Sequence, residues 1–535
     1  MSKVISKSIS KRKIALYLIV IGLGSLFLKL YLVDFSLPDT GDSWVYILRT
    51  MSNSQGYFSE TPEKTQGWNM FVSPFFLLTN SNNYIDYVNI MRLVSIAIST
   101  LTILPMYLLA RKFFHEKYSI IAASFIAFQP QLHYNASIGF SESFFILILI
   151  GAFFFILQNK LNKYVLLSFI LIGFLFWARF PGIVFILPFI VIFFIQYRHS
   201  KNFYKYFVIG ILIFIIVISP ILLERYALYD NPVYYLNSEF SDSDSILDKF
   251  FTGLTNEFHA FVITSIPYLI FLFPIGMFFS LKKYETKKKN YVSVWILFIG
   301  STIPFIMAYS TLDASRMLFH LYPFLIIFST LAIQQINDKK YKIFSMKKNN
   351  IFLTTIIIFM ILSSILITFG IDGYGYGRPD AIKTNEIREY GKFLINDLDG
   401  KMFWSKGVDS DWIFVVLLEE SNGDFKNYKI NPYDTLRFKE IESYNSGNFY
   451  LLINDELYDN TLEKVILNGE QIGLRYISIG EQNTQSFFDD VYLNEDKYEY
   501  LTKIFDSKEQ GFQKYKVKAF EIDYKKFHIL YEKST

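Results

Sequence analysis

The chain has 535 residues, of which 52% are apolar and 19% aromatic, and its formal net charge is only +4. This composition excludes an ordinary water-soluble protein of such length and indicates membrane-spanning helices, which need about 20 apolar residues each. The chain has no cysteine, which excludes disulfides, zinc–thiolate sites and cysteine nucleophiles, and no basic stripe that would favour nucleic acid.

Apolar runs that predict membrane-spanning helices recur along the chain and end near residue 370. The eleven runs cover residues 14–33, 88–110, 118–135, 139–158, 163–178, 181–197, 204–223, 258–281, 291–309, 315–335 and 350–370. The first run is long for a signal peptide and lacks a small-residue cleavage site, so we expect a retained helix. The predicted fold class is an α-helical polytopic membrane protein.

The basic residues predict how the helices are oriented. The segments before the first run and after each even-numbered run hold 23 Lys and Arg residues, whereas the opposite side holds eight. Because cytoplasmic loops carry the excess of basic residues, the N-terminus is expected in the cytoplasm. An odd number of spans then places the first loop (34–87), the loop 224–257 and residues 371–535 outside.

Residues 371–535 differ in composition from the rest of the chain. They start with "DGYGYGRPD" and then mix a helical pattern, "NEIREYGKFLINDL", with the β-rich runs "KMFW", "FYLLIN", "LRYISIG" and "KVKAFEI". This mixture predicts a small α/β domain. We therefore expect two domains, a transmembrane domain over residues 1–370 and a soluble extracytoplasmic domain over residues 371–535.

The stretch "LPDTGDSWVYILRTM" (37–51) places carboxylates at the predicted outer membrane edge. In a helix that begins at Asp42, the side chains of Asp42, Tyr46 and Arg49 share one face, and the apolar residues favour another, as in an interfacial helix. Alternatively, Asp42 is only an N-cap and Arg49 only touches lipid headgroups. Asp39, in the turn-like "PDTG", is a weaker candidate than Asp42 for the catalytic base.

Further polar residues fall at the same predicted edge. His133 and Glu142 lie in "HYNASIGFSES", where Ser141 could cap a helix whose dipole favours Glu142 in its first turn. Arg179, in "FWARFPG", follows a helix whose C-terminal dipole favours a cation, so structure alone could explain it.

The segment "TLDASRMLFHLYP" (311–323) carries the strongest signal. Arg316 lies at the start of a span, where the helix dipole disfavours a cation, and His320 follows at i+4 on the same predicted helical face, already inside the apolar run. Polar groups at that depth are costly and usually mark function. A helix N-terminus with an Arg and a His fits a phosphate.

Together these segments resemble the GT-C type integral-membrane glycosyltransferases that use a polyprenyl-phosphate-linked sugar, such as protein O-mannosyltransferases and aminoarabinose transferases. The resemblance rests on "GDSWVY", "NASIGFSESFF", "ARFPGIVFILP", "DNPVYY" and "SRMLFHLYP". Two positions depart from the family pattern: Ser43 replaces a second acid, and Met317 replaces an aromatic residue. No "WWD" occurs, which argues against transfer of a whole oligosaccharide.

The resemblance implies a membrane enzyme that moves a sugar from a polyprenyl (dolichyl-type) phosphate to a lipid, glycan or protein acceptor on the outer face, with inversion. In this interpretation Asp42 is the catalytic base and Glu142 a second catalytic carboxylate. The donor phosphate is bound by Arg316, His320 and Arg179. The supporting residues are Asp39, Tyr46, Arg49 and His133.

Several alternatives stay open at this point. A divalent ion such as Mg²⁺ or Mn²⁺ could bridge Asp42 and Glu142. A transporter or lipid flippase would place charges near the bilayer midplane and often shows repeated halves. A non-catalytic anchor or receptor for the outer domain would not need polar residues at the ends of so many spans. The position of the charges at the outer edge favours the transferase.

Overall fold

The structure, a computed structural model, divides into two compact units. It describes residues 9–38, 42–56, 66–232, 269–282, 288–308, 315–338, 349–370, 381–398, 401–404, 415–416, 418–419, 450–452, 461–471, 473–481 and 486–534. Unit 1 comprises Met1–Val33, Pro62–Val72 and Met91–Arg378; unit 2 comprises Asp34–Thr61, Ser73–Ile90 and Pro379–Thr535. Unit 2 therefore combines most of the first loop with the C-terminal residues.

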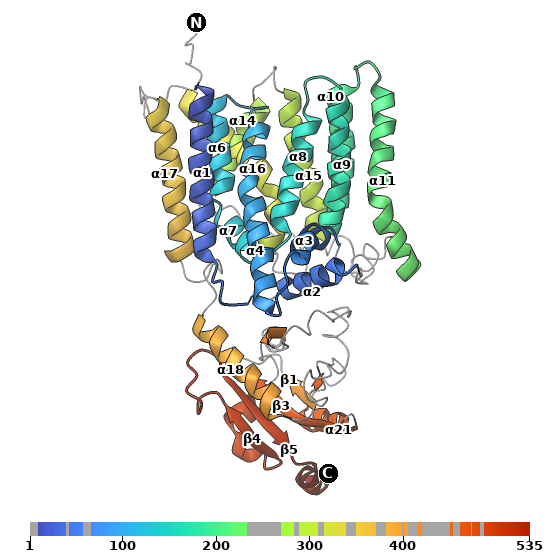
Figure 1. Ribbon diagram of the computed structural model, residues 1–535, viewed down its shortest axis with the longest axis vertical. Helices are drawn as coiled ribbons and strands as arrows, with labels where there is room; N and C mark the ends of the chain where they lie inside the picture. The colour runs from blue at the N-terminus through green and yellow to red at the C-terminus, as the bar shows by residue number, and fades with distance from the viewer. Residues whose placement is uncertain are drawn as a thin grey trace. The chain divides into compact units, whose positions relative to one another are not determined.

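Unit 1 is a bundle of apolar helices that run side by side (Figure 1). Its helices are α1 (Lys11–Leu32), α5 (Ile103–Ala110), α6 (Glu116–Ala127), α7 (Pro130–Ser137), α8 (Glu142–Ile156), α9 (Lys163–Ala178), the 3₁₀ helix η1 (Phe180–Phe185), α10 (Ile186–Tyr197), α11 (Phe203–Tyr229), α14 (Leu269–Lys282), α15 (Lys288–Ala308), the 3₁₀ helix η2 (Ser315–Leu321), α16 (Tyr322–Asp338) and α17 (Asn349–Gly370). Two further helices, α3 (Gly67–Leu77) and α4 (Tyr84–Leu101), contribute residues to both units.

The helices of the described ranges support a multi-pass membrane protein. Five stretches are long and apolar enough to cross a membrane: Lys11–Leu32, Tyr84–Ala110, Phe180–Tyr197, Phe203–Ala227 and Leu318–Asn337. Four shorter apolar helices cover Glu142–Ile156, Lys163–Ala178, Leu269–Leu281 and Thr354–Leu366. The total of eleven spans stays a prediction. Most of the predicted outer loop 224–257 and the start of the span 258–281 lie outside the described residues.

One predicted span, 118–135, is broken in the structure. Helix α6 ends at Ala127, and the chain continues through Gln129 in an extended conformation (φ −76°, ψ 118°) before α7 begins at Pro130. The break has a local cause, because the ring of a proline disfavours the helical conformation of the residue before it. The result is a short helix, α7, within the bundle.

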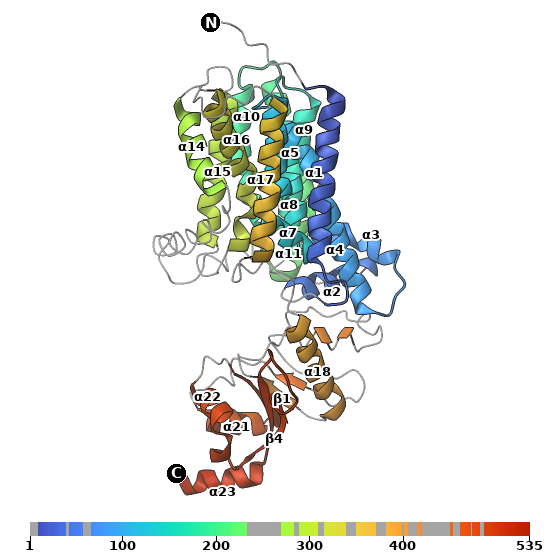
Figure 2. The ribbon, with the colours of Figure 1, turned by 90° about the vertical axis from the view of Figure 1, so that its left-hand side faces the viewer.

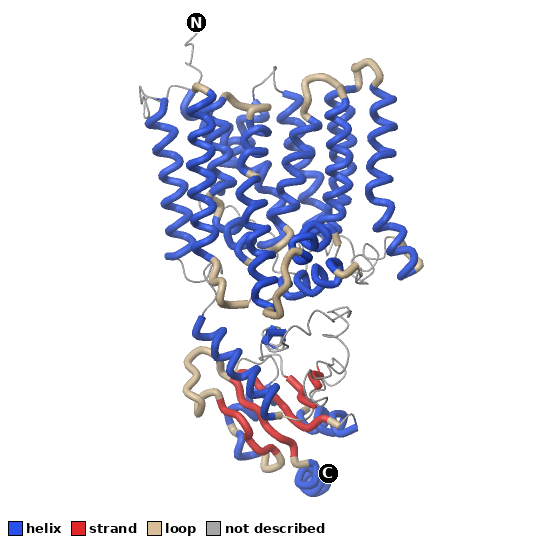
Figure 3. Tube along the Cα trace, viewed as in Figure 1, coloured by secondary structure: helices blue, strands red, loops and turns tan. Residues whose placement is uncertain are grey.

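Unit 2 contains a five-stranded mixed sheet in the order β2-β1-β3-β5-β4 (Figure 3). Its strands are β1 (Lys401–Trp404), β2 (Tyr450–Leu452), β3 (Leu474–Gly480), β4 (Leu501–Asp506) and β5 (Val517–Ile522), and its helices are α2 (Asp42–Ser54), α18 (Ala381–Asp397), α21 (Leu462–Gln471), α22 (Ser486–Leu493), the 3₁₀ helix η6 (Glu495–Lys497) and α23 (Tyr524–Ser534). Strand β1 pairs in parallel with β2 and β3, whereas β5 is antiparallel to β3 and β4. The four β-rich runs seen in the sequence correspond to β1, β2, β3 and β5.

Helices cover both faces of this sheet, with α18 and α21 on opposite sides (Figure 2). Side chains alternate along β3, so Ile477 packs with Phe488 of α22 while Ser478 hydrogen-bonds Tyr390 of α18 across 2.5 Å. Phe393, also on α18, packs against Phe505 of β4 with ring centroids 4.8 Å apart and ring planes tilted by 37°. Burial raises the pKa of Tyr390, so its phenol stays neutral on this face.

Helix α18 also anchors the loop before β5 through one carboxylate. Glu386 accepts backbone N–H bonds from Gln513 (2.5 Å), Lys514 (2.9 Å) and Tyr515 (2.7 Å). Since hydrogen bonds to a charged acceptor contribute about 1.5–3 kcal/mol each, this carboxylate is the main connection between the helix and that loop.

We predict that Glu386→Gln lowers hydrogen-exchange protection of the amides of residues 513–515 and destabilises unit 2 by about 1–3 kcal/mol, because the neutral amide offers a single acceptor oxygen. The matched control is Glu389→Gln, at an exposed position of the same helix. Equal exchange in the two variants would show that the carboxylate does not hold the loop.

Candidate active site

A buried ion pair joins two helix ends of unit 1. Glu142 is the first residue of α8, and Arg179 directly follows α9. The Arg179 Nη1 atom donates to Glu142 Oε1 at 2.7 Å, with the side chains 13% and 1% exposed. Opposite charges in an apolar bundle need such pairing because isolated charges there are costly. Arg179 is the member of the pair that keeps some exposure.

The chain after α9 turns sharply, and this turn places Arg179. Arg179 is extended (φ −155°, ψ 139°), and its carbonyl accepts the Gly182 N–H at 2.8 Å as η1 begins. A Cβ atom on Gly182 would lie 2.2 Å from the Leu175 carbonyl oxygen. Only glycine therefore allows η1 to fold back this closely on α9, and the sequence "ARFPG" encodes the turn.

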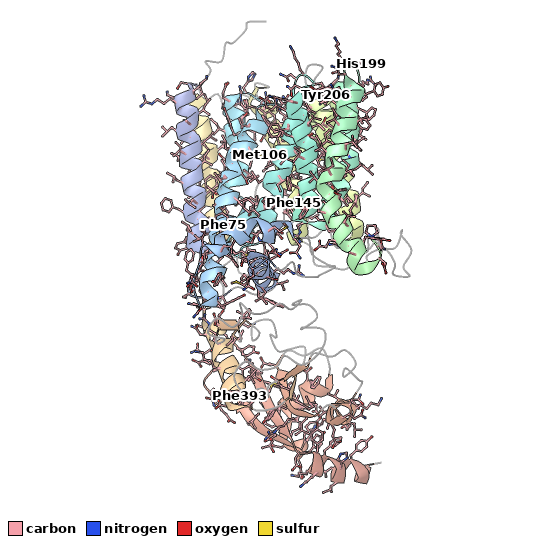
Figure 4. All side chains as sticks on the ribbon, turned by 45° about the vertical axis from the view of Figure 1, so that its right-hand side comes forward. Phe75, Met106, Phe145, His199, Tyr206 and Phe393 are labelled. Atoms are coloured by element: carbon pink, nitrogen blue, oxygen red, sulfur yellow. The ribbon has the colours of Figure 1, made fainter. Side chains whose placement is uncertain are left out.

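Aromatic rings from three elements surround the pair. The Arg179 guanidinium lies 5.3 Å from the ring centroid of Phe319 in η2, a cation–π distance. Phe145 of α8 (labelled in Figure 4) meets Phe319 edge-on at 5.2 Å and Phe185 of η1 at 5.9 Å. His320 is fully buried and meets both Phe185 and Phe319 edge-on at 6.1 Å. The ion pair therefore lies in an apolar setting with a histidine nearby.

The start of α3 packs against the same helix ends. A Cβ atom on Gly67 would lie 2.5 Å from the backbone carbonyl of Trp177, in the last turn of α9. Trp68 donates from Nε1 to the Gly139 carbonyl at 3.1 Å, and its ring lies 5.8 Å from that of Phe144 in α8. These contacts fix the ends of α8 and α9 relative to each other.

The structure joins two of the predicted site residues, Glu142 and Arg179, in an ion pair, and His320 contacts the rings of Phe319 and Phe185 beside this pair. The predicted cap by Ser141 is not formed, since its hydroxyl makes no hydrogen bond among the described residues. The shared helical face predicted for Arg316 and His320 is wrong, because η2 is a 3₁₀ helix with three residues per turn. The side chain of Arg316 lies outside the described part of the chain.

Helix α2 forms where the sequence predicts it, with Asp42 as its first residue. It is not the interfacial helix with one polar face that its pattern indicates: every residue from 44 to 51 is buried, including Tyr46 (6% exposed) and Arg49 (0%). Asp39 and the side chain of Asp42 lie outside the described residues. Their predicted roles stay predictions.

His133 lies in α7 and is 1% exposed. Its helix packs on α1, the helix that carries Lys29. Lys29, Trp68 and Phe319 were not predicted as site residues from the sequence. A lysine inside the apolar run "SLFLKLYLV" is a signal that could have identified Lys29.

The predicted divalent ion finds little support in the described side chains. Among them, no group of three or more His, Asp or Glu residues could hold a metal. Glu142 is neutralised by Arg179 at 2.7 Å, and a cation beside that guanidinium would be repelled. Glu142 in this ion pair therefore does not fit a metal ligand.

Comparisons with known proteins bear on the fold. Residues 86–223 match the family described as dolichyl-phosphate-mannose-protein mannosyltransferase, whereas no curated protein matches the sequence. The apo oligosaccharyltransferase of Archaeoglobus fulgidus is similar with a TM-score of 0.60 and 12% identity, over 88% of this chain and 70% of that chain. The same enzyme in complex with Zn and sulfate is similar with a TM-score of 0.53 and 13% identity, over 86% of this chain and 67% of that chain.

A third similar structure is that of ArnT from Cupriavidus metallidurans bound to undecaprenyl phosphate. Its TM-score is 0.52 at 9% identity, and the match covers 96% of this chain and 98% of that chain. At such identities the structures establish the fold. The resemblance to GT-C type enzymes that the sequence motifs indicate is thus confirmed, by the family match over residues 86–223 and by the fold over most of the chain.

We predict that Arg179→Gln destabilises the protein by about 3–5 kcal/mol, because it leaves the carboxylate of Glu142 buried without its cation. The double variant Glu142→Gln/Arg179→Gln should recover much of this loss, since no charge is then buried. The measurement is reversible unfolding in mixed detergent micelles.

The control is the more exposed pair of Arg111 and Glu116, 2.8 Å apart with side chains 34% and 24% exposed. Arg111→Gln should cost less than about 1 kcal/mol. Simple additivity of the Glu142 and Arg179 substitutions would contradict the coupling.

Proposed function

We propose that the protein is a membrane glycosyltransferase that moves a sugar from a polyprenyl-phosphate donor to a lipid, glycan or protein acceptor on the outer face of the membrane. The observation that carries this proposal is the ion pair of Glu142 and Arg179 with His320 close to it, buried at helix ends in a bundle with the fold of polyprenyl-phosphate-binding ArnT. Arginine binds phosphate oxygens through a planar set of N–H donors.

In the proposed reaction a hydroxyl oxygen of the acceptor attacks the anomeric carbon of the sugar. The bond between this carbon and the lipid-phosphate oxygen breaks, and the electron pair leaves with the phosphate. Asp42 takes the hydroxyl proton as general base. Arg179, Arg316 and His320 stabilise the negative charge that develops on the leaving phosphate. Attack from the side opposite the phosphate inverts the anomeric centre.

The predicted orientation of the chain and its buried ion pair favour this proposal over a transporter and over a receptor or anchor. The basic loops favour a cytoplasmic N-terminus and an extracytoplasmic C-terminus, which would place Asp42 and Glu142 on the outer side. A transporter would favour unpaired or relay charges along a path through the bilayer. A receptor or anchor would gain nothing from a buried pair that can meet a phosphate. No step is assigned to a metal ion.

We further propose that the C-terminal residues position the first loop. Arg388 of α18 forms a two-bond ion pair with Glu419 (Nε–Oε2 2.9 Å, Nη2–Oε1 2.6 Å) and also donates from Nη2 to the Ser36 carbonyl at 3.0 Å. Asn89 donates to the adjacent Phe35 carbonyl at 2.9 Å. Both bonds hold the backbone of the first loop just before the segment that carries Asp42.

Asp42→Asn tests the proposed base. Since Asn caps a helix about as well as Asp but accepts no proton, turnover should fall about 10²–10⁴-fold with almost no change in stability. The assay follows release of free polyprenyl phosphate from a sugar-loaded lipid by purified protein. Asp39→Asn is the matched control and should retain activity. If Asp39→Asn is inactive while Asp42→Asn turns over normally, Asp39 is the base. If both variants keep full activity, this loop takes no part in the reaction.

Arg388→Lys tests the positioning role. Lysine keeps the charge but cannot make the two-bond pair and the bond to Ser36 together. We expect kcat to fall about ten- to a hundredfold, as for a misplaced catalytic group, with an unchanged KM for the lipid donor. Arg475→Lys, in the exposed pair with Glu521 (2.9 Å), is the control. A rise in donor KM with unchanged kcat would contradict positioning of the base.

A further inference from the structure

Helix α7 is a polar helix inside the apolar bundle. Its sequence is "PQLHYNAS", and seven of its eight residues are buried: Pro130, Gln131, Leu132, His133, Asn135, Ala136 and Ser137. Buried polar groups at membrane depth are rare and usually mark a functional site, because lipid and apolar side chains cannot satisfy them. The question for α7 is therefore where its polar atoms find partners.

The first turn of α7 has partners within the bundle. Gln129 donates from Nε2 to the Tyr322 hydroxyl at 3.2 Å, and that hydroxyl donates to Gln131 Oε1. The second turn is different. Both ring nitrogens of His133 and both amide atoms of Asn135 are buried without a hydrogen-bond partner among the described residues. Leaving such atoms unsatisfied costs about 1–3 kcal/mol each.

A buried lysine of α1 lies beside this turn. Helix α1 packs along α6 and α7 (Figure 1), and Val33, the C-cap of α1, lies in one apolar cluster with Ala136, one turn after His133. Lys29 is 1% exposed, and its Nζ donates one hydrogen bond, to Ser25 Oγ at 2.7 Å, while Ser25 donates to the Ala127 carbonyl. Ser25, one turn before Lys29, bonds to Ala127, and Val33, one turn after Lys29, lies in one apolar cluster with Ala136, so Lys29 lies at the level of the turn that carries His133.

We infer that Lys29, His133 and Asn135 form a second anion site, which takes the phosphate oxygens of a ligand. An ammonium has three donors, an imidazole ring at least one and an amide two, and no carboxylate pairs with Lys29 in the described part of the chain. A phosphate would satisfy the donors that the protein leaves without acceptors and would neutralise the buried cation. The phosphate could belong to a lipid headgroup or be free in solution.

This inference does not rest on the proposed transfer reaction, because none of the residues given a step in that reaction belongs to this site; His133 was expected from the sequence only as a supporting residue. The test uses the purified full-length chain in detergent, with inorganic phosphate, farnesyl phosphate and farnesol as probes. The readouts are equilibrium binding and the ¹⁵N shifts of labelled histidine. Lys29→Met is the main variant, because it removes the buried charge, keeps an unbranched side chain of similar length, and should be at least as stable as the natural chain.

We expect Lys29→Met and Asn135→Leu each to weaken phosphate binding about tenfold or more, because each variant loses one charge-assisted hydrogen bond. Both variants should also abolish the change in the ¹⁵N shifts of His133 that phosphate causes. Binding of inorganic phosphate identifies a free-anion site, and binding of farnesyl phosphate alone identifies a lipid-headgroup site; both outcomes support the inference. The control is Lys112→Met, at a lysine that already bonds Gln158 (3.3 Å), and it should bind normally.

Three results would overturn the inference. Farnesol could bind as tightly as farnesyl phosphate, phosphate binding could be insensitive to Lys29, or Lys29→Met could be strongly destabilised, which would give Lys29 a purely structural role. The double variant Glu142→Gln/Arg179→Gln, expected to be folded, separates this site from the proposed donor site. If the double variant abolishes binding of farnesyl phosphate while Lys29→Met does not weaken it, the second site is absent while the proposed function stands.

Discussion

The buried ion pair of Glu142 and Arg179 is the constraint on which the arrangement of unit 1 depends. The two side chains come from the start of α8 and the end of α9, and they meet at 2.7 Å inside an apolar bundle. Separating them would leave a bare carboxylate where water is scarce, so the two helix ends cannot move apart. The tight turn at Gly182 and the contact of Gly67 with α9 are possible only while those ends stay in place.

The pair also limits what the site can do electrostatically. Its two charges cancel, so a doubly charged lipid phosphate would not be bound strongly by Arg179 alone. The proposed donor site therefore needs a further cation, and we propose Arg316 for that role, in the same short helix as His320. The cluster of Lys29, His133 and Asn135 has the opposite character, because its positive charge has no acidic partner among the described residues.

Much of the fold follows from local sequence signals. The end of α9 at Ala178 is predicted by "ARFPG", and β3 coincides with "LRYISIG", because a turn with proline and glycine and a β-branched run are local properties. The break before Pro130 was missed because apolar periodicity alone ignores the residue before a proline. Strand β4, "LTKIFD", was missed because its alternation of apolar and polar residues is weak.

The candidate site was predictable residue by residue but not as an arrangement. Glu142, Arg179 and His320 each stood out at a predicted membrane edge, yet no spacing in the sequence links residues on separate helices. The pattern of η2 could not be told from an α-helix, so the predicted alignment of His320 with Arg316 failed. The burial of Lys29 depends on which face of α1 packs on α7, and that is decided by tertiary contacts.

The most direct test of the account is turnover by the charge-neutral double variant Glu142→Gln/Arg179→Gln, purified and shown by its melting temperature to be folded. Release of free polyprenyl phosphate from a sugar-loaded lipid is measured beside the natural chain. We predict steady release by the natural chain and a loss of about a hundredfold or more in the double variant, as when a charge-stabilising donor is removed from an active site. Release by the folded double variant at the natural rate would contradict it.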